Sequence, residues 1–394
     1  WALYGLPPLA TPPELLPAAD PWLGLAGEWI DAASPYGPLW ELIALGAFHA
    51  SGGSFLIQLF LLKLVAVLAY LGCIGFIYRT LTLLRPDWAI VGSIAFAWNP
   101  LVLFESVQNA HNDIVMVFFF VVAVWVFVRY HSPLPEGEGL GVREKTSQGI
   151  QPPRVGDGRL QVSELLLFCL MLAASVLIKF VTILAAPFFI IALTMRRPRW
   201  PERLQVFTLL SAVLAALIII PMLFVWPGLE DWAVIQSAGG AGRSLLALLV
   251  LGLKDIIGTN PAFDLSRNVI VVIFGLIYLY QLGLMLKPAQ SLERPIKATF
   301  VIFFWYVLLA APVFHAWYLL WFLPAAVLLL PRQRPLAAAI VFSITALTII
   351  PYFETVRVWY PFLLRNHFIG HLIGVPLLIL PPTLTLLWPT GSTD

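Results

Sequence analysis

The stretch from Trp98 to Asp113, WNPLVLFESVQNAHND, gathers side chains that could do chemistry within an otherwise apolar sequence. Its second half carries six carboxylate, amide or imidazole groups: Glu105, Gln108, Asn109, His111, Asn112 and Asp113. A long apolar run, IVMVFFFVVAVWVFV, follows directly. Polar groups beside hydrocarbon cost free energy unless they are paired or hydrated. The segment from Glu105 to Asp113, called the polar knot below, therefore predicts a binding or catalytic site.

A simpler interpretation of the knot is a polar cap on the next helix. Asn112 or Asp113 stands just before the apolar run and can cap that helix. One such residue is enough for a cap, however, and the knot supplies six polar side chains. If the preceding helix continues to its end, Glu105 and Asn109 share a face. The N-terminus of the next helix also presents free N–H groups to an anion, which favours the functional interpretation.

Two aromatic motifs are further candidates. Tyr36 and Trp40 flank a turn in SPYGPLW, and His315, Trp317 and Tyr318 form the motif HAWY. An interfacial helix and an aromatic belt at the membrane surface would explain the aromatic residues. They do not explain His315, which could bind phosphate or assist proton transfer. Trp317 and Tyr318 could stack on the face of a sugar.

Lys179 ends an otherwise apolar segment, LIKFVTILAAPF. A lysine near a helix end can simply extend to the membrane surface. This end is assigned to the outside, however, against the usual distribution of basic residues. A cation there would suit a lipid phosphate. The sequence holds no HExxH, CxxC, Walker or GxSxG motif, so neither a metal site nor another cofactor is expected.

The amino-acid composition indicates the class of protein that carries these groups. Of the 394 residues 60% are hydrophobic and 11% are charged, whereas globular chains carry about 25% charged residues. Strand-like alternation is absent, so an all-α polytopic membrane protein is predicted. The net charge of +2 without a basic stripe gives no indication of nucleic-acid binding. Cys73 and Cys169 lie in apolar segments and are interpreted as small buried hydrophobes.

Apolar runs predict about eleven transmembrane helices, since each needs roughly 20 residues. They lie near 53–78, 87–104, 113–130, 163–179, 181–195, 204–225, 267–286, 296–313, 316–331, 335–352 and 367–388. Most lysines and arginines fall in one set of loops, which is assigned to the cytoplasm. The segment 1–52, the knot, 227–266, 314–318 and 353–366 then share the extracytoplasmic side. One domain, 1–394, is expected, with an interfacial helix in 1–52 and a disordered cytoplasmic insertion at 132–160, which is rich in Pro, Gly and charge.

Taken in order, SPYGPLW, WNPLVLFESVQNAHND, LIKFVTILAAPFF and HAWYLLWFLPA resemble a known family. They look like the bacterial polyprenol-phosphate-mannose-dependent α-mannosyltransferases of the GT-C superfamily, near glycosyltransferase family 87. The resemblance runs from about Pro21 to Trp321. The family's HAWY region usually has Gln or Pro before an aromatic pair, so this motif is the weaker match.

The resemblance implies an inverting transfer outside the cytoplasm, at the bacterial plasma membrane. A sugar, mannose in this family, would leave a polyprenyl phosphate and join a hydroxyl of a glycolipid or glycan acceptor in the bilayer. Asp113, His315 and Asp20 are then candidate catalytic residues. The candidate substrate-binding residues are His111, Asn112, Asn109, Glu105, Tyr36, Lys179, Trp317 and Tyr318.

One departure from the family concerns the first span. GT-C enzymes carry their main catalytic Asp just after a first transmembrane span, and that span is expected to be missing here. Asp20 lies in the corresponding loop but not directly after a span, so the base could lie upstream of Trp1. Two other classes stay open: a transporter or flippase for lipid-linked sugars, and a non-catalytic subunit or decayed enzyme. A transporter should place polar residues at the midplane and show internal repeats, neither of which is evident.

Overall fold

The structure is a computed structural model that describes residues 3–17, 20, 23–131, 162–226, 228, 241–287 and 291–388. In these residues every named element is helical, and the strand-like contact is an isolated bridge between Gly242 and Val313. The all-α prediction is confirmed. The segment 132–160, expected to be disordered, lies outside the described residues.

The helices have the following bounds. The longer ones are α1 (Pro38–Ala50), α2 (Phe55–Leu84), α3 (Ala89–Ala97), α5 (Asp113–His131), α6 (Val162–Ile178), α7 (Ala186–Met195), α8 (Trp200–Leu223), α10 (Leu245–Ile257), α11 (Thr259–Met285), α12 (Glu293–Trp305), α14 (Gln333–Pro351) and α17 (His367–Leu387). The short ones are η1 (Pro13–Leu15), η2 (Leu23–Trp29), η3 (Pro86–Trp88), α4 (Pro100–Leu103), η4 (Phe104–Gln108), η5 (Phe180–Leu184), η7 (Tyr306–Ala310), η8 (Ala316–Trp321), α13 (Leu323–Leu328), η9 (Tyr352–Val356), α15 (Arg357–Trp359) and α16 (Pro361–Arg365).

Each expected span coincides with one helix or with consecutive helices of the structure. Among the described residues, five helices are long and apolar enough to cross a membrane: Phe55–Leu84, Trp200–Leu223, Thr259–Met285, Gln333–Trp359 and His367–Leu387. The pair Pro86–Ala97 and Pro100–Gln108, bent by 55°, would make a sixth as one broken span. Shorter apolar helices fall at other expected spans. The chain is therefore a multi-pass membrane protein, and the total of about eleven spans stays a prediction.

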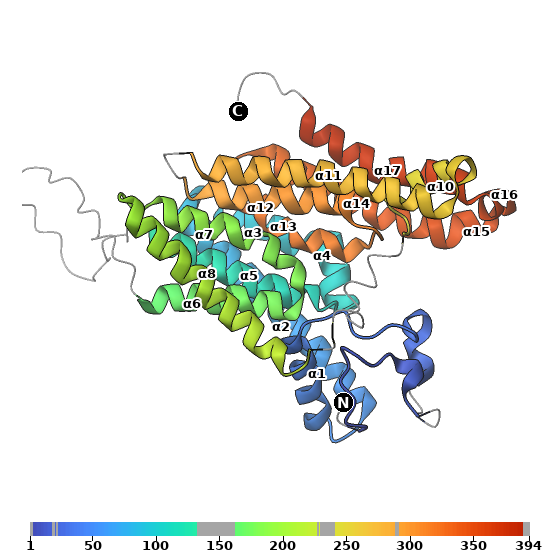
Figure 1. Cartoon of the computed structure of the whole chain (residues 1–394), viewed down its shortest axis with the longest axis horizontal. Helices are drawn as coiled ribbons and strands as arrows, with labels where there is room; N and C mark the ends of the chain where they lie inside the picture. Colours follow the sequence, from blue (N-terminus) through green and yellow to red (C-terminus); the bar gives the residue numbers. More distant parts are fainter. Residues whose placement is uncertain are drawn as a thin grey trace, which may run out of the picture.

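Helix α5 lies at the centre of the molecule. It is apolar around its whole circumference, which suits a helix surrounded by protein, and most of its described side chains are buried. It packs against α2, α6 and η8. In Figure 1 the helices from α2 to α8 lie together, and those from α10 to α17 lie beside them as a second group. The N-terminal end of α5, where the knot stands, thus faces several elements from distant parts of the sequence.

The outer helices expose apolar side chains over most of their length. Less than a third of the apolar window of α2, α8 and α11 is buried inside the protein. Water would disfavour such surfaces, whereas hydrocarbon accommodates them. Cys73 and Cys169 are both buried and unpaired, which confirms their interpretation as small hydrophobes.

Polar contacts of the chain lie near both ends of α2. At one end Glu293 forms ion pairs with Arg85 at 2.7 Å and with Arg332 at 3.2 Å, and all three belong to the loops assigned to the cytoplasm. At the other end Lys63, near the start of α2, donates to the Gln108 carbonyl of the knot. The part of α2 from Lys63 to Leu84 is about 30 Å long at a rise of 1.5 Å per residue.

Candidate functional site

The first polar residue of the stretch, Asn99, is a structural cap. Its Oδ1 accepts from the backbone N–H of Leu101 at 3.0 Å and of Val102 at 3.3 Å, so it caps α4. Its Nδ2 donates to Ser343 Oγ on α14 at 3.1 Å. Pro100 occupies the first turn of α4, where its missing N–H costs nothing. Asn99 therefore fixes the start of the helix that carries the knot.

The knot turns back on itself because its backbone departs from α-helix twice. Residues Phe104–Gln108 form a π-helical turn, η4, an irregularity that is frequent at functional sites. Ala110 then adopts φ 56°, a left-handed conformation that costs a residue with a Cβ about 1–3 kcal/mol. The His111 N–H donates to the Glu105 carbonyl at 2.9 Å. This return brings the side chains of Glu105 and His111 together.

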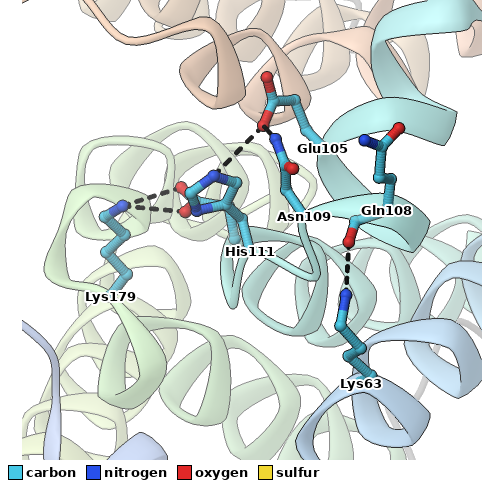
Figure 2. A network of polar contacts seen from close by, with 7 residues as sticks. Lys63, Glu105, Gln108, Asn109, His111 and Lys179 are labelled. Carbon is cyan, nitrogen blue, oxygen red and sulfur yellow. Dashed lines mark hydrogen bonds and ion pairs between the residues drawn. The ribbon is translucent and has the colours of Figure 1, made fainter. Parts of the chain in front are cut away.

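Glu105 is the hub of the first polar cluster. Its Oε2 accepts from Asn109 Nδ2 at 3.0 Å and lies 3.2 Å from His111 Nε2. Figure 2 shows the three side chains converging from η4 and the following turn. The Glu105 side chain is 2% exposed, so its polar partners come from the protein. The expectation that Glu105 and Asn109 share a face is confirmed.

Asp113 is the hub of the second cluster. Its Oδ1 and Oδ2 accept from Lys179 Nζ at 2.9 and 3.0 Å, and Oδ1 also accepts from Trp321 Nε1 at 2.6 Å. The three residues come from α5, from the residue after α6 and from η8. The Asp113 side chain is 1% exposed and that of Lys179 is 16% exposed. A half-buried lysine is thus held by a buried carboxylate that accepts three hydrogen bonds.

Aromatic rings line the Lys179 ammonium. Its Nζ lies 5.7 Å from the ring centroid of Tyr36, 5.3 Å from that of Tyr318 and 5.5 Å from that of Trp321. Faces of aromatic rings attract a cation at these distances. Burial raises the pKa of Tyr36 to about 12, and the negative charges of Asp113 and Glu41 act in the same direction. Tyr36 therefore stays neutral beside the ion pair.

Gly37 brings the YGPLW motif against the end of α6. A Cβ at Gly37 would lie 2.1 Å from the Leu177 carbonyl oxygen, so a residue without a side chain is needed there. The Gly37 N–H donates to the Ile178 carbonyl at 3.0 Å, and Pro38 opens α1. This contact places Tyr36 next to Lys179.

A stack of rings connects the knot with the HAWY motif. The His111 and Trp317 rings are stacked with centroids 4.0 Å apart, and those of Trp317 and His315 are stacked at 4.2 Å. Trp29 of η2 lies 6.4 Å from the His315 ring. Burial lowers the pKa of His315 to about 4, and the positive charges of Lys179 and Arg243 contribute. His315 is therefore neutral at physiological pH.

The structure brings most of the predicted site residues together at one end of the molecule. They are Glu105, Asn109, His111, Asp113, Tyr36, Lys179, His315, Trp317 and Tyr318. Asp20 accepts from the Tyr4 hydroxyl at 2.9 Å within the N-terminal segment, and this described contact does not join it to the site.

The interpretation of Asn112 or Asp113 as a helix cap is wrong. Asn112 is buried, and neither its Oδ1 nor its Nδ2 has a hydrogen-bond partner among the described residues. The Asp113 carboxylate bonds Lys179 and Trp321 rather than backbone N–H groups.

The hydrogen bond from Trp321 to Asp113 is a contact of the candidate site that the sequence did not reveal. The sequence gives only a weak indication of this contact. A buried tryptophan N–H needs an acceptor, but the position of Trp321 next to the HAWY motif does not identify Asp113 as that acceptor. Among the described residues no group of three or more His, Cys, Asp or Glu side chains could hold a metal ion.

The sequence of the chain is similar to those of known proteins. Residues 8–195 match the family described as alpha-(1->6)-mannopyranosyltransferase, N-terminal domain. The chain is also 25% identical over 340 residues to an alpha-(1->6)-mannopyranosyltransferase of Mycobacterium tuberculosis. The chain resembles the membrane α-mannosyltransferases. This confirms the resemblance drawn from the sequence motifs. The aligned region is 76% of this chain and 54% of that relative, so the chain spans about half the length of the protein it matches.

The matched family region contains most of the site described above. It includes YGPLW, the whole knot and Lys179. The aromatic partners Trp317, Tyr318 and Trp321 lie beyond residue 195. The site is therefore assembled from the part that matches the family and from a later part of the chain.

Proposed function

We propose that the chain is a membrane glycosyltransferase that moves mannose from a polyprenyl phosphate to a hydroxyl of a glycolipid or glycan. The transfer inverts the anomeric carbon, needs no metal ion and takes place on the extracytoplasmic face of a bacterial plasma membrane. The observation that carries the proposal is the ion pair between half-buried Lys179 and buried Asp113, which aromatic rings surround.

Lys179 is suited to hold the phosphate of the donor. An ammonium group has three N–H donors, and Asp113 accepts through two oxygen atoms, which leaves one N–H for a phosphate oxygen. The ammonium would stabilise the negative charge that develops on the leaving phosphate. Asp113 and Trp321 fix the position of the lysine, so the cation needs little reorganisation during the reaction.

The aromatic rings around Lys179 are suited to hold the sugar. Tyr36, Tyr318 and Trp317 offer flat apolar faces and polar edges next to the proposed phosphate position. In the reaction the acceptor oxygen forms a bond to the anomeric carbon while the bond from that carbon to the phosphate oxygen breaks. The electron pair leaves with the polyprenyl phosphate, and the hydroxyl proton passes to a base of the site.

The comparisons support the choice of sugar. The matched family and the mycobacterial relative are both described as alpha-(1->6)-mannopyranosyltransferases, which suggests mannose as the sugar and an α-(1→6) linkage as the product. The distribution of basic residues supports an extracytoplasmic site, because the ion pairs of Glu293 lie at the opposite end of the molecule.

A transfer assay in lipid vesicles tests the proposal. The purified chain receives radiolabelled polyprenyl-phosphate mannose and a bacterial glycolipid pool, and the variant Lys179→Met is compared with the unmodified chain. Glu293→Gln is the matched control, since it removes an ion-paired carboxylate far from the site. Label should reach the acceptor with the unmodified chain and the control but not with Lys179→Met. Equal transfer by Lys179→Met would refute the assigned site.

A further inference from the structure

We propose that Lys63 binds the phosphate of the polyprenyl-phosphate donor as this lipid enters from the bilayer, before the phosphate reaches Lys179. The inference rests on the proposed function and adds to it a docking site and a direction of entry for the donor. Lys63 has no part in the transfer step itself.

The ammonium group of Lys63 is joined to the knot. Its Nζ donates to the Gln108 carbonyl at the end of η4, and α2 packs against η4. An ammonium has three N–H donors, so this bond leaves two for another acceptor. The residue is partly exposed, which leaves it accessible from outside the protein. Figure 2 shows Lys63 on one side of the knot and Lys179 on the other.

The position of Lys63 along α2 matches the level of lipid phosphates. Arg85 follows the last residue of α2, and its ion pair with Glu293 belongs to the end assigned to the cytoplasm. The part of α2 from Lys63 to Leu84 is about 30 Å long, which is the thickness of the hydrocarbon core of a bilayer. An upright α2 thus places Lys63 at the extracytoplasmic edge of that core, where lipid headgroups carry their phosphates.

An apolar stripe on α2 runs from Lys63 toward the cytoplasm. The side chains of Phe60, Leu64, Leu68 and Leu71 are exposed, and their spacing of three and four residues puts them on one face of the helix. Lys63 borders this face, because it lies three residues after Phe60. A lipid whose phosphate binds Lys63 can therefore lay its chain along α2. A polyprenyl phosphate has this form, with one anionic phosphate on a long apolar chain.

A purely structural role would explain only part of these observations. A lysine near the end of a span can extend to the surface, and Lys63 does satisfy the Gln108 carbonyl. A neutral donor would satisfy that carbonyl as well, whereas a cation next to hydrocarbon costs free energy. Asp113 pairs with Lys179, but no carboxylate among the described residues forms an ion pair with Lys63. A lipid phosphate would supply the missing negative charge.

The two lysines then act in sequence. The donor phosphate first binds Lys63, with the polyprenyl chain along α2. It next moves past the knot to Lys179, which Asp113 and the aromatic rings hold at the transfer site. Lys63 therefore raises the fraction of protein molecules that have a donor beside the site. Its loss should lower kcat/KM for the donor and leave kcat unchanged.

Transfer kinetics of the full chain in vesicles, with the donor and acceptor described above, give the first test. Lys63→Met keeps the apolar stem of the side chain but removes its charge. A charge-assisted hydrogen bond corresponds to about a tenfold change in binding or more. For Lys63→Met, kcat/KM for the donor should therefore fall by about tenfold, with kcat within about threefold of the unmodified chain. Lys63→Arg should restore kcat/KM, because it restores the charge.

Lys254→Met is the matched control for the first test. Lys254 is a partly exposed lysine near the end of α10, in a segment assigned to the same extracytoplasmic side. Its replacement removes the same charge away from the knot, so kcat and kcat/KM should both stay unchanged.

A binding measurement that needs no transfer gives the second test. Sugar-free polyprenyl phosphate should raise the Tm of Lys179→Met in detergent, because this variant retains Lys63. The double variant with Lys63→Met and Lys179→Met should show no such rise, whereas the combination of Lys254→Met with Lys179→Met should show it. Phosphatidylglycerol at the same concentration distinguishes the two sources of a lipid phosphate and should give no rise.

Three results would overturn the proposal. They are a kcat/KM of Lys63→Met equal to that of Lys254→Met, a Tm of Lys179→Met that polyprenyl phosphate does not raise, and a rise that phosphatidylglycerol matches. The last would assign Lys63 to the anionic lipids of the bilayer. If Lys63→Met does not fold, Lys63→Gln replaces it in both tests, since glutamine lacks the charge but keeps an N–H donor. Absence of transfer by the unmodified chain would refute the proposed function, and the Tm measurement would still decide whether Lys63 binds the lipid.

Discussion

The close contact between Gly37 and the end of α6 predicts that Gly37→Ala destabilises the protein. Gly37 lies so close to Leu177 that a Cβ would stand 2.1 Å from its carbonyl oxygen and 2.5 Å from its carbonyl carbon. Both are backbone atoms of a helix end, so they cannot turn aside as a side chain could. In Gly37→Ala the turn must move away from α6, which breaks the hydrogen bond from Gly37 N–H to the Ile178 carbonyl.

The expected cost has two parts. Overpacking of this kind costs about 1–3 kcal/mol, and loss of the hydrogen bond adds about 1 kcal/mol. The free energy of unfolding should therefore fall by roughly 2–4 kcal/mol. The movement also withdraws Tyr36 from the Lys179 ammonium, so the KM for the sugar donor should rise.

The assay is thermal unfolding in detergent together with transfer kinetics. Gly46→Ala is the matched control, because Gly46 lies within α1 and a Cβ there meets no atom within 4 Å. It should be as stable as the unmodified chain or more stable by about 0.5–1 kcal/mol. If Gly37→Ala unfolds at the same temperature as Gly46→Ala and binds the donor equally well, the proposed docking of the YGPLW turn is wrong.

Three further predictions concern single groups. Asn99→Ala should lower the free energy of unfolding by about 1–2 kcal/mol, because the cap of α4 and the bond to Ser343 are lost, and thermal unfolding would show it. Trp321→Phe should lower the free energy of unfolding by about 2 kcal/mol, because it removes the N–H donor to Asp113. Unchanged stability and unchanged affinity for the sugar donor would show that this hydrogen bond does not contribute. His315 is held neutral by a pKa of about 4 in the folded chain, against about 6.5 in the unfolded chain. The unfolded state therefore binds more protons as the pH falls from 6.5 to 4, and stability should decline in that window. His315→Gln should show a smaller decline in Tm between pH 7 and pH 5; an equal decline would assign it to other groups.

The helices and most residues of the site were predictable because each is marked by a short, continuous stretch of sequence. Apolar runs of helical length follow from the sequence, and every expected span coincides with helical structure. The knot, YGPLW, Lys179 and HAWY were each expected to lie at one side, since polar groups next to hydrocarbon need partners. The contacts of Lys179 with Asp113, Tyr36 and Tyr318 confirm that these motifs meet.

The pairing within the site was not predictable because it depends on backbone irregularities and distant contacts. A regular helical period does not place His111 against Glu105; the π-turn η4 and the left-handed Ala110 do. The interpretation of Asn112 or Asp113 as a helix cap failed for the same reason. Trp321 reaches Asp113 across more than two hundred residues of sequence, a distance over which spacing carries no information.

The measurement that tests the central claim most directly is sugar transfer from a polyprenyl phosphate by the purified chain in lipid vesicles. Radiolabelled polyprenyl-phosphate mannose and a glycolipid pool are supplied to the unmodified chain, to Lys179→Met and to Glu293→Gln. Label in the acceptor with the unmodified chain and Glu293→Gln, and its loss with Lys179→Met, is the result predicted here. A folded unmodified chain that transfers no label with varied donors and acceptors would contradict the account and favour transport of the lipid-linked sugar.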